Sequence, residues 1–190
     1  MNTVTENMIN EVVINKSRFI ACLFNVKSVE DVKLILSDIK EKYKDASHYC
    51  YAYIIDDIKK SSDDGEPGGT AGVPIMEVLS KNKLNYVLCI VVRYFGGIKL
   101  GAGGLVRAYS KAVVETIKIS NLRKVIDGFK IQLTINYDDE SRLNKLLINS
   151  NYTCSYQEKI KYIIICDALL KDKLDSIYDI EYSEYTKIIK

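Results

Sequence analysis

The sequence of 190 residues contains no tryptophan, one histidine, two prolines and five widely spaced cysteines. A single histidine excludes a metal site built from several histidines. An odd number of cysteines without a Cys-x-x-Cys pair indicates reduced, buried thiols rather than a disulfide framework. No apolar run approaches the roughly 18 residues that a membrane helix needs, and no signal-like segment opens the chain. We therefore expect a soluble cytoplasmic protein with no membrane partner, no metal and no cofactor.

Glycine is also scarce, except in one region. Nine of the ten glycines and both prolines lie between Gly65 and Gly104, in two blocks that span residues 63–74 and 96–104. Glycine permits positive φ and close backbone approach, but it raises the entropy cost of ordering the chain. Glycines concentrated in this way indicate a specific backbone conformation, so we expect the functional site in these two blocks.

Acidic residues are nearly absent from an overlapping stretch. The net charge of the chain is only +2, but residues 81–124 hold nine lysines and arginines and a single acid, Glu115. This basic stretch begins just before the second glycine block. The imbalance favours an anionic partner, although surface lysines also serve solubility alone.

The hydrophobic pattern predicts an α+β domain over residues 1–124. Its expected elements are strands at 7–15, 18–26, 47–55 and 85–95, a helix that opens at a Ser28 capping box, a short helix near Pro74, and a long helix from Gly103 or Gly104 to about Ile119. The capping box and the proline are both typical of helix starts. The succession of buried strand, glycine block and basic helix is the strongest organisational signal in the chain.

The pattern restarts around residues 123–127, where we place a domain boundary, so that residues 125–190 form a second domain. The expected elements are a strand at 129–136, a helix at 138–149, strands at 151–158 and 160–167, a helix at 169–178 and a strand at 181–189. This βαββαβ order is that of a ferredoxin-like unit. The segment has almost no glycine, no proline and no histidine, which indicates an interaction or spacer domain.

The second glycine block leads directly into a helix N-terminus, where free N–H groups and the helix dipole favour an anion. Basic side chains lie on both sides of it. The candidate anion-binding or nucleic-acid-binding residues are Arg93, Lys99, Gly101, Gly103, Gly104, Arg107 and Lys111. The block is neither a Walker A loop nor a dinucleotide fingerprint. The alternative interpretation is a tight turn whose glycines serve packing.

The first glycine block carries three carboxylates, Asp63, Asp64 and Glu66. Such a cluster could hold a divalent cation or supply a general base, but acidic residues also cap turns and helices. We favour loop architecture and partner contact over catalysis or metal binding. The candidate loop and pocket residues are His48, Asp64, Gly65, Glu66, Pro67, Gly69, Thr70, Gly72, Gly96 and Gly97.

The strand at 47–55 places His48 and Cys50 on one face, where they could form a Cys–His pair. A hydrogen-bonded histidine near the pocket is the favoured interpretation. Tyr49, Tyr51 and Tyr53 fall on the opposite face. They would either stack bases, as RNA-binding sheets do, or pack beneath a helix, which we favour. No Gly-x-Ser-x-Gly elbow occurs, and no catalytic residue is assigned.

Four stretches, residues 16–21, 48–53, 63–74 and 92–109, carry a resemblance to a known family. Through them the chain resembles the IMPACT/YigZ family over about residues 1–120. The remainder agrees with the small C-terminal domain of bacterial members. The resemblance implies an N-terminal two-layer α/β sandwich similar to domains of a small-subunit ribosomal protein, elongation factor G and the GHMP kinases, followed by a ferredoxin-like domain.

The resemblance also implies a place in translation. Eukaryotic members act in translational control by competing for an activator of the general-control kinase, a partner that does not transfer to bacterial members. Nucleic-acid or ribosome binding is the usual suggestion for the latter, and the likeness to GHMP kinases adds nucleotide binding as an alternative. Val73 stands where many relatives have Lys or Arg, which removes one phosphate contact if that residue makes one.

Three functions follow from these observations. The leading one is a non-enzymatic, translation-associated or regulatory protein that binds RNA, the ribosome or another anionic partner through its glycine-rich blocks. The alternative is a small-molecule enzyme or a nucleotide or phosphate binder that uses His48 and the carboxylates from Asp63 to Glu66. A protein–protein adaptor is the third.

Overall fold

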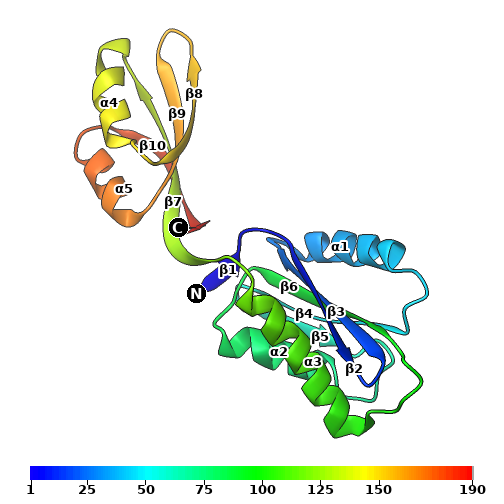
Figure 1. Cartoon of the computed structure of the whole chain (residues 1–190). Coiled ribbons are helices and arrows are strands. Elements are labelled where there is room, and N and C mark those ends of the chain that lie inside the picture. The colour runs from blue at the N-terminus through cyan, green and yellow to red at the C-terminus, as the bar shows by residue number, and fades with distance from the viewer. Residues whose placement is uncertain (190) are drawn as a thin grey trace. The chain divides into compact units, whose positions relative to one another are not determined.

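The computed structural model describes residues 1–189, and the chain divides into two units, Met1–Lys124 and Val125–Lys190. Unit 1 contains strands β1 to β6, helices α1 to α3 and the start of strand β7 (Figure 1). Unit 2 contains the rest of β7, strands β8 to β10 and helices α4 and α5. Each unit is built around hydrophobic side chains of its own.

A five-stranded antiparallel sheet with the order β2-β3-β6-β4-β5 forms the centre of unit 1. Its strands are β2 (Met8–Ile14), β3 (Ser17–Asn25), β4 (His48–Ile55), β5 (Ile58–Ser62) and β6 (Val87–Tyr94). Strand β6 is the middle strand, and it is buried from Val87 to Arg93. Arg93, a charged residue near the end of β6, is therefore buried in the interior.

Helices cover both faces of this sheet (Figure 1). Helix α1 (Val29–Lys42) packs on one face, and helices α2 (Gly72–Lys81) and α3 (Gly101–Lys118) pack on the other. The two-layer sandwich implied by the resemblance is thus wrong, because the unit has three layers. The physical reason is that β3, β4 and β6 are apolar at successive positions, so both faces of the sheet must be covered.

Most predicted elements of unit 1 are confirmed, but two strands were missed. Strand β1 (Asn2–Val4) and strand β5 are short, and β5 is mostly polar. Strand β1 pairs with the first residues of β7 (Leu122–Ile135). The domain boundary placed around residues 123–127 falls within this strand, because the backbone continues there as one strand.

Helix α3 begins at Gly101, two to three residues before the predicted start at Gly103 or Gly104. Glycine is a poor helix former, which is why the sequence pattern misplaced this end. Gly101, Gly103 and Gly104 therefore lie within the first helical turn instead of a loop. At Gly104 a Cβ would lie 3.0 Å from the Cβ of Leu100, so its absence lets Leu100 pack closely there.

Unit 2 contains the predicted βαββαβ succession. Its elements are β7, a 3-10 turn (Tyr137–Asp139) that leads into α4 (Glu140–Leu146), β8 (Asn151–Tyr156), β9 (Ile160–Cys166), α5 (Ala168–Asp175) and β10 (Ile180–Ile189). All strand pairs are antiparallel, and β7 lies between β9 and β10. Alternate residues of β9 are buried, which places Ile160, Tyr162, Ile164 and Cys166 on the helix-covered face. The helix predicted at 138–149 is shorter than expected.

The five cysteines are free thiols, and four of them are buried. Burial raises the pKa of Cys22 and of Cys50 to about 12, so both are protonated at neutral pH. Such thiols pack as small apolar groups rather than react. Among residues 1–189, no helix combines the length and the apolar character that a membrane crossing requires.

Gly96 lies directly against the turn that joins β2 to β3. A Cβ at this position would be 2.0 Å from the carbonyl carbon of Lys16, which is backbone. We expect Gly96→Ala to lower the free energy of unfolding by about 1–3 kcal/mol, as overpacking does. Gly103→Ala is the control, because its Cβ would meet only the Arg107 guanidinium at 3.6 Å. Urea denaturation of both variants measures the difference, and equal stability of the two would contradict the assignment.

Candidate pocket at the start of helix α3

The two glycine blocks meet beside the start of helix α3. Between them lies a pocket of about 400 Å³, which we call the His48 pocket. It is lined by His48, Glu66, Pro67, Arg93, Phe95, Lys99, Leu100, Gly101, Ala102 and Leu105. Strand β4, the first glycine block, strand β6, the second glycine block and α3 each contribute to it. The pocket therefore depends on the packing of two strands, both glycine blocks and helix α3.

A buried ion pair forms the inner wall of the His48 pocket. The Nη1 of Arg93 donates to the Oε1 of Glu66 at 2.5 Å, and the two side chains are only 6% and 3% exposed. The hydroxyl of Tyr109, on α3, donates to the same oxygen at 2.7 Å. Two donors on one buried carboxylate oxygen stabilise the charge that burial would otherwise penalise.

Arg93 has a second set of contacts. Its guanidinium lies between the rings of Phe19 and Phe95, 5.3 and 5.5 Å from their centroids. Its Nε is buried and has no hydrogen-bond partner among residues 1–189. A guanidinium in contact with two aromatic rings keeps a fixed orientation, and its Nε–H group stays without a hydrogen bond within the described chain.

His48 is hydrogen-bonded within the first glycine block, as the favoured interpretation predicted. Its Nδ1 lies 2.8 Å from the carbonyl oxygen of Asp64, and its Nε2 lies 3.9 Å from Oε1 of Glu66. Since a carbonyl only accepts, Nδ1 carries the proton. The Cys–His pair is wrong, because Cys50 donates its thiol to the carbonyl of Asp63 instead.

The carboxylates of the first glycine block serve three different purposes. Asp63 accepts the backbone N–H groups of Gly69, Ala71 and Gly72 at 2.8–2.9 Å, and so holds the start of α2. Asp64 accepts the N–H of Tyr49 at 2.7 Å. Glu66 belongs to the buried pair. Residues 1–189 contain no cluster of three potential metal ligands, and the three carboxylates do not converge.

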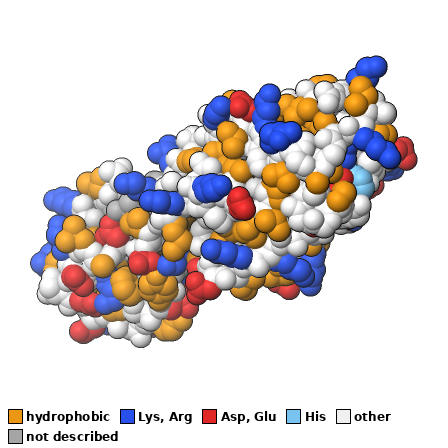
Figure 2. Space-filling model, turned by 90° about the horizontal axis from the view of Figure 1, so that it is seen from below, with side chains coloured by type: hydrophobic (Ala, Val, Ile, Leu, Met, Phe, Trp, Pro, Cys, Tyr) orange, Lys and Arg blue, Asp and Glu red, His pale blue; other side chains and the backbone are white. Residues whose placement is uncertain are grey.

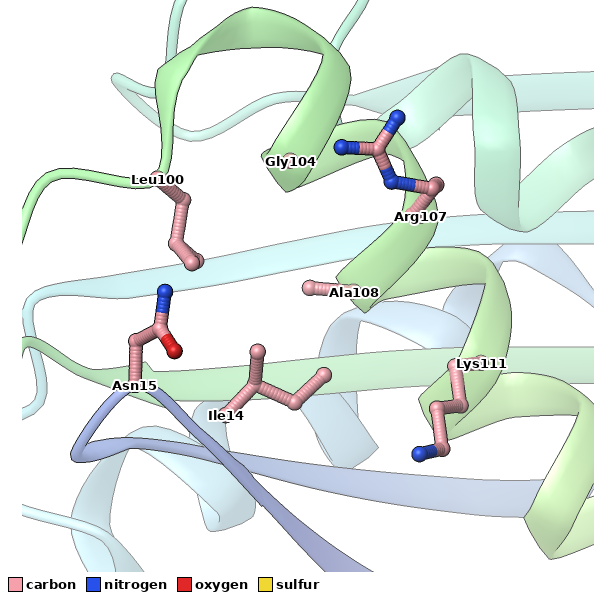
Figure 3. Close-up of a pocket in the computed structure, with 7 residues that line it drawn as sticks. All are labelled: Ile14, Asn15, Leu100, Gly104, Arg107, Ala108 and Lys111. Atoms are coloured by element: carbon pink, nitrogen blue, oxygen red, sulfur yellow. The ribbon is translucent and has the colours of Figure 1, made fainter.

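A second pocket of about 300 Å³, the Lys111 pocket, lies along α3 (Figure 3). Arg107 and Lys111 extend from successive turns of the helix, and Ile14 and Asn15 face them from the end of β2. Leu100 lines both pockets. The two pockets therefore share one boundary side chain at the start of α3.

The candidate anion-binding residues divide between the two pockets. Arg93, Lys99 and Gly101 line the His48 pocket, and Gly104, Arg107 and Lys111 line the Lys111 pocket. Gly103 lines neither. Helix α3 has no side-chain cap at its start, so its first N–H groups lack a side-chain acceptor. Basic side chains and backbone N–H groups without a side-chain acceptor thus lie together at the start of α3.

The remaining candidates in the glycine blocks shape the backbone. Gly65, Gly69 and Gly97 have φ of +85°, +77° and +84°, which glycine adopts readily. A Cβ at Gly72 would lie 2.8 Å from the backbone of Ser62. Thr70 is buried and donates to the carbonyl of Pro67 at 2.7 Å. The four glycines and Thr70 fix the backbone of the two blocks, and they line neither the His48 pocket nor the Lys111 pocket.

The tyrosines of β4 belong to the packed face of the sheet. Tyr53 is buried, and Tyr49 and Tyr51 pack partly against the core beneath α1. The covered-sheet interpretation is confirmed for Tyr53, which no base could reach. Five residues of the site were not among the sequence-based candidates: Phe95, Leu100, Ala102 and Leu105, which line the His48 pocket, and Tyr109, which bonds to Glu66. The sequence Phe95-Gly96-Gly97, an aromatic residue directly before two glycines, was a pattern from which Phe95 could have been predicted.

The surface around the site mixes charge and apolar groups. Figure 2 shows the histidine in pale blue near one edge, with hydrophobic and charged side chains around it. Lys99 and Arg107 form no ion pair with a carboxylate among residues 1–189, although carboxylates are close to several other lysines. Two uncompensated cations therefore lie at the start of α3.

The fold and the site define a two-unit α/β protein with a basic, glycine-rich helix start. Residues 15–117 match the Impact N-terminal domain family, and the chain therefore belongs to the IMPACT family. It is 52% identical over 116 residues to IMPACT family member YvyE of Bacillus subtilis, a match that covers 60% of this chain and 54% of that protein. It thus matches about half the length of that relative.

Two further relatives match more of the chain. IMPACT family member YigZ of Escherichia coli is 35% identical over 151 residues, which covers 73% of this chain and 74% of that protein. A crystal structure described as that of a hypothetical protein is 29% identical and has a TM-score of 0.67. The superposition covers 92% of this chain and 91% of the other. Both units are thus part of the likeness.

Removal of the buried carboxylate tests the inner wall of the pocket. We expect Glu66→Gln to lower the free energy of unfolding by about 3–5 kcal/mol, because it leaves the charge of Arg93 buried without its partner. Glu77→Gln is the matched control, since Glu77 pairs with Lys81 on the surface and contributes about 0.5 kcal/mol or less. Urea denaturation measures both variants. Equal effects would show that the pair is not a buried one.

The stability of the protein should depend on the ionisation of Asp63. Burial acts to raise the pKa of this carboxyl, but the three backbone N–H groups outweigh it and hold the pKa below its usual value. A lowered pKa in the folded state means that the unfolded chain binds the proton first as the pH falls. The stabilisation is present at neutral pH and is lost as the pH falls below about 4, the usual pKa of an aspartate, and through the lower pKa of the folded state.

We therefore expect Asp63→Asn to cost about 1–2 kcal/mol at neutral pH, the range of a lost helix cap, and to cost less at about pH 3. Asp38→Asn on the exposed side of α1 is the control. Thermal denaturation followed by circular dichroism at a series of pH values gives both profiles. Parallel profiles for wild type and Asp63→Asn would contradict this role.

Proposed function

We propose that this protein is a non-enzymatic regulator of translation that binds RNA, with the start of α3 as its contact to the phosphates. The observation that carries the proposal is the pair of uncompensated cations, Lys99 and Arg107, beside the uncapped N-terminus of α3. Lys111 adds a third positive charge in the adjoining pocket. Lysine, arginine and helix N-terminal N–H groups are the usual phosphate contacts.

The charge distribution supports a polyanion rather than a single phosphate. The cations lie in two pockets along one helix, separated by Leu100. A chain of phosphates can engage both pockets at once, and each neutralised phosphate releases counterions. Membership of the IMPACT family, whose resemblance implies translational control, favours RNA of the translation machinery as this polyanion.

The enzymatic alternative has less support in the side chains. Of the groups it requires, Asp63 holds the start of α2, Glu66 is paired with Arg93, and the thiol of Cys50 has a raised pKa. A general base or a nucleophile must be free to exchange a proton with its substrate. His48 keeps Nε2 without a hydrogen bond among residues 1–189, with the Glu66 carboxylate 3.9 Å away.

Unit 2 is proposed as a ferredoxin-like domain that offers a second docking surface. Its βαββαβ succession and antiparallel sheet agree with that assignment. Its helices pack on one face of the sheet, and Ile163 and Ile165 of β9 point away from that face and are more than a third exposed. A ribosomal protein would be a fitting partner for such a surface.

Fluorescence anisotropy with a labelled single-stranded RNA tests the proposal. We expect affinity to fall steeply between about 50 and 200 mM salt, with a log–log slope near −2 if about three phosphates are contacted. Lys99→Glu/Arg107→Glu should weaken binding at least tenfold at low salt. Lys59→Glu/Lys60→Glu on β5 is the matched control, because it makes the same change in net charge away from both pockets.

Equal losses in the two charge-reversal variants would show that net charge alone drives binding, which would contradict the site. Affinity that does not change with salt would contradict phosphate contacts altogether. In that case, capture of a protein from purified ribosomes at both salt concentrations would identify the adaptor function instead.

A further inference from the structure

We infer that the His48 pocket holds one unpaired base of the bound RNA, so that the protein prefers single-stranded to duplex RNA. This inference rests on the proposed RNA binding and specifies which form of RNA is bound. It assigns separate tasks to the two pockets. The Lys111 pocket takes phosphate, and the His48 pocket takes a base together with a phosphate beside Lys99.

An exposed aromatic ring at the pocket is the first observation. Phe95 lines the His48 pocket and is 49% exposed, although it directly follows the buried strand β6. Its ring also contacts the Arg93 guanidinium, so its orientation is fixed from one side. A fixed ring with half of its surface free is a platform on which a base can stack, an interaction that every base can make.

The composition of the pocket is the second observation. Pro67, Leu100 and Leu105 supply apolar walls, and the volume of about 400 Å³ lies at the lower end of the range for small-molecule sites. A flat, largely apolar base fits such walls. A duplex keeps its bases stacked and paired, so it cannot place one there without opening.

Polar groups at the same pocket match the edge of a base. Because Nδ1 of His48 donates to the carbonyl of Asp64, Nε2 is the ring nitrogen left for a hydrogen bond to the edge of a base. Arg93 also lines the pocket, and its guanidinium is held from behind by the Glu66 carboxylate.

The phosphates of the same nucleotide have partners nearby. Lys99 and Gly101 line the His48 pocket together with Phe95, and Arg107 lies beyond Leu100 in the adjoining pocket. A nucleotide with its base against Phe95 therefore has cations for its phosphates along the start of α3. Base and backbone contacts are thus available within one segment of unit 1.

Four RNA probes and four variants test this inference. The probes are a labelled single-stranded 12-mer, a duplex of the same sequence, the 12-mer with abasic positions, and a hairpin with an unpaired loop. The variants are Phe95→Ala, Phe95→Trp, Ile98→Ala and Lys99→Glu/Arg107→Glu. Ile98 is the matched control for Phe95, because it is exposed in the same segment and does not line the pocket. Anisotropy gives each affinity, and circular dichroism verifies that each variant is folded.

We expect the 12-mer to bind at least tenfold more tightly than the duplex and the abasic strand. Phe95→Ala should weaken binding of the 12-mer about tenfold, which corresponds to the loss of one stacked base, and leave the duplex affinity unchanged. Phe95→Trp should preserve the preference, and Ile98→Ala should have no effect. Binding of the hairpin should resemble that of the 12-mer.

Two results would overturn the inference while RNA binding stands. One is equal affinity for the 12-mer, the abasic strand and the duplex, with all three weakened by Lys99→Glu/Arg107→Glu. The other is equal behaviour of Phe95→Ala and Ile98→Ala. Absence of binding to every probe would instead overturn the proposed function, and this inference with it.

Discussion

The buried pair of Glu66 and Arg93 is the interaction on which the site depends. Arg93 comes from the middle strand of the sheet, and Glu66 comes from the first glycine block. Tyr109 on α3 donates to the same carboxylate oxygen. Since either charge alone would be costly to bury, the strand, the block and the helix are stable only when they are assembled together. The position of each pocket wall follows from this requirement.

Much of the fold could be predicted from local pattern. Long apolar strands such as β6, and helices with a strong apolar face such as α1 and α3, are confirmed with small errors at their ends. Short or polar strands were missed, because β1 and β5 are strands only through their neighbours. The third layer of unit 1 was also missed, because the fold was inferred from the resemblance. The resemblance gave no information on whether both faces of the sheet are apolar.

The site could be predicted in outline but not in its contacts. The glycine and charge patterns indicated the two blocks, and the structure brings both of them to one pocket. Sequence spacing could not show that Glu66 pairs with Arg93, 27 residues away, or that Cys50 turns to the carbonyl of Asp63. Those contacts depend on how β4, β6 and α3 pack. For the same reason Tyr109 was not recognised as part of the polar wall.

The hydrogen bonds of Asp63 have a kinetic consequence. Three backbone donors held by one carboxylate, together with the Thr70 bond to Pro67, keep the segment from Gly65 to Gly72 in one conformation. A loop rich in glycine would otherwise lose much conformational entropy when a ligand orders it. Here that ordering is complete once the chain has folded. If RNA binds here as proposed, its association is governed by diffusion and long-range electrostatic attraction rather than by slow rearrangement of the loop.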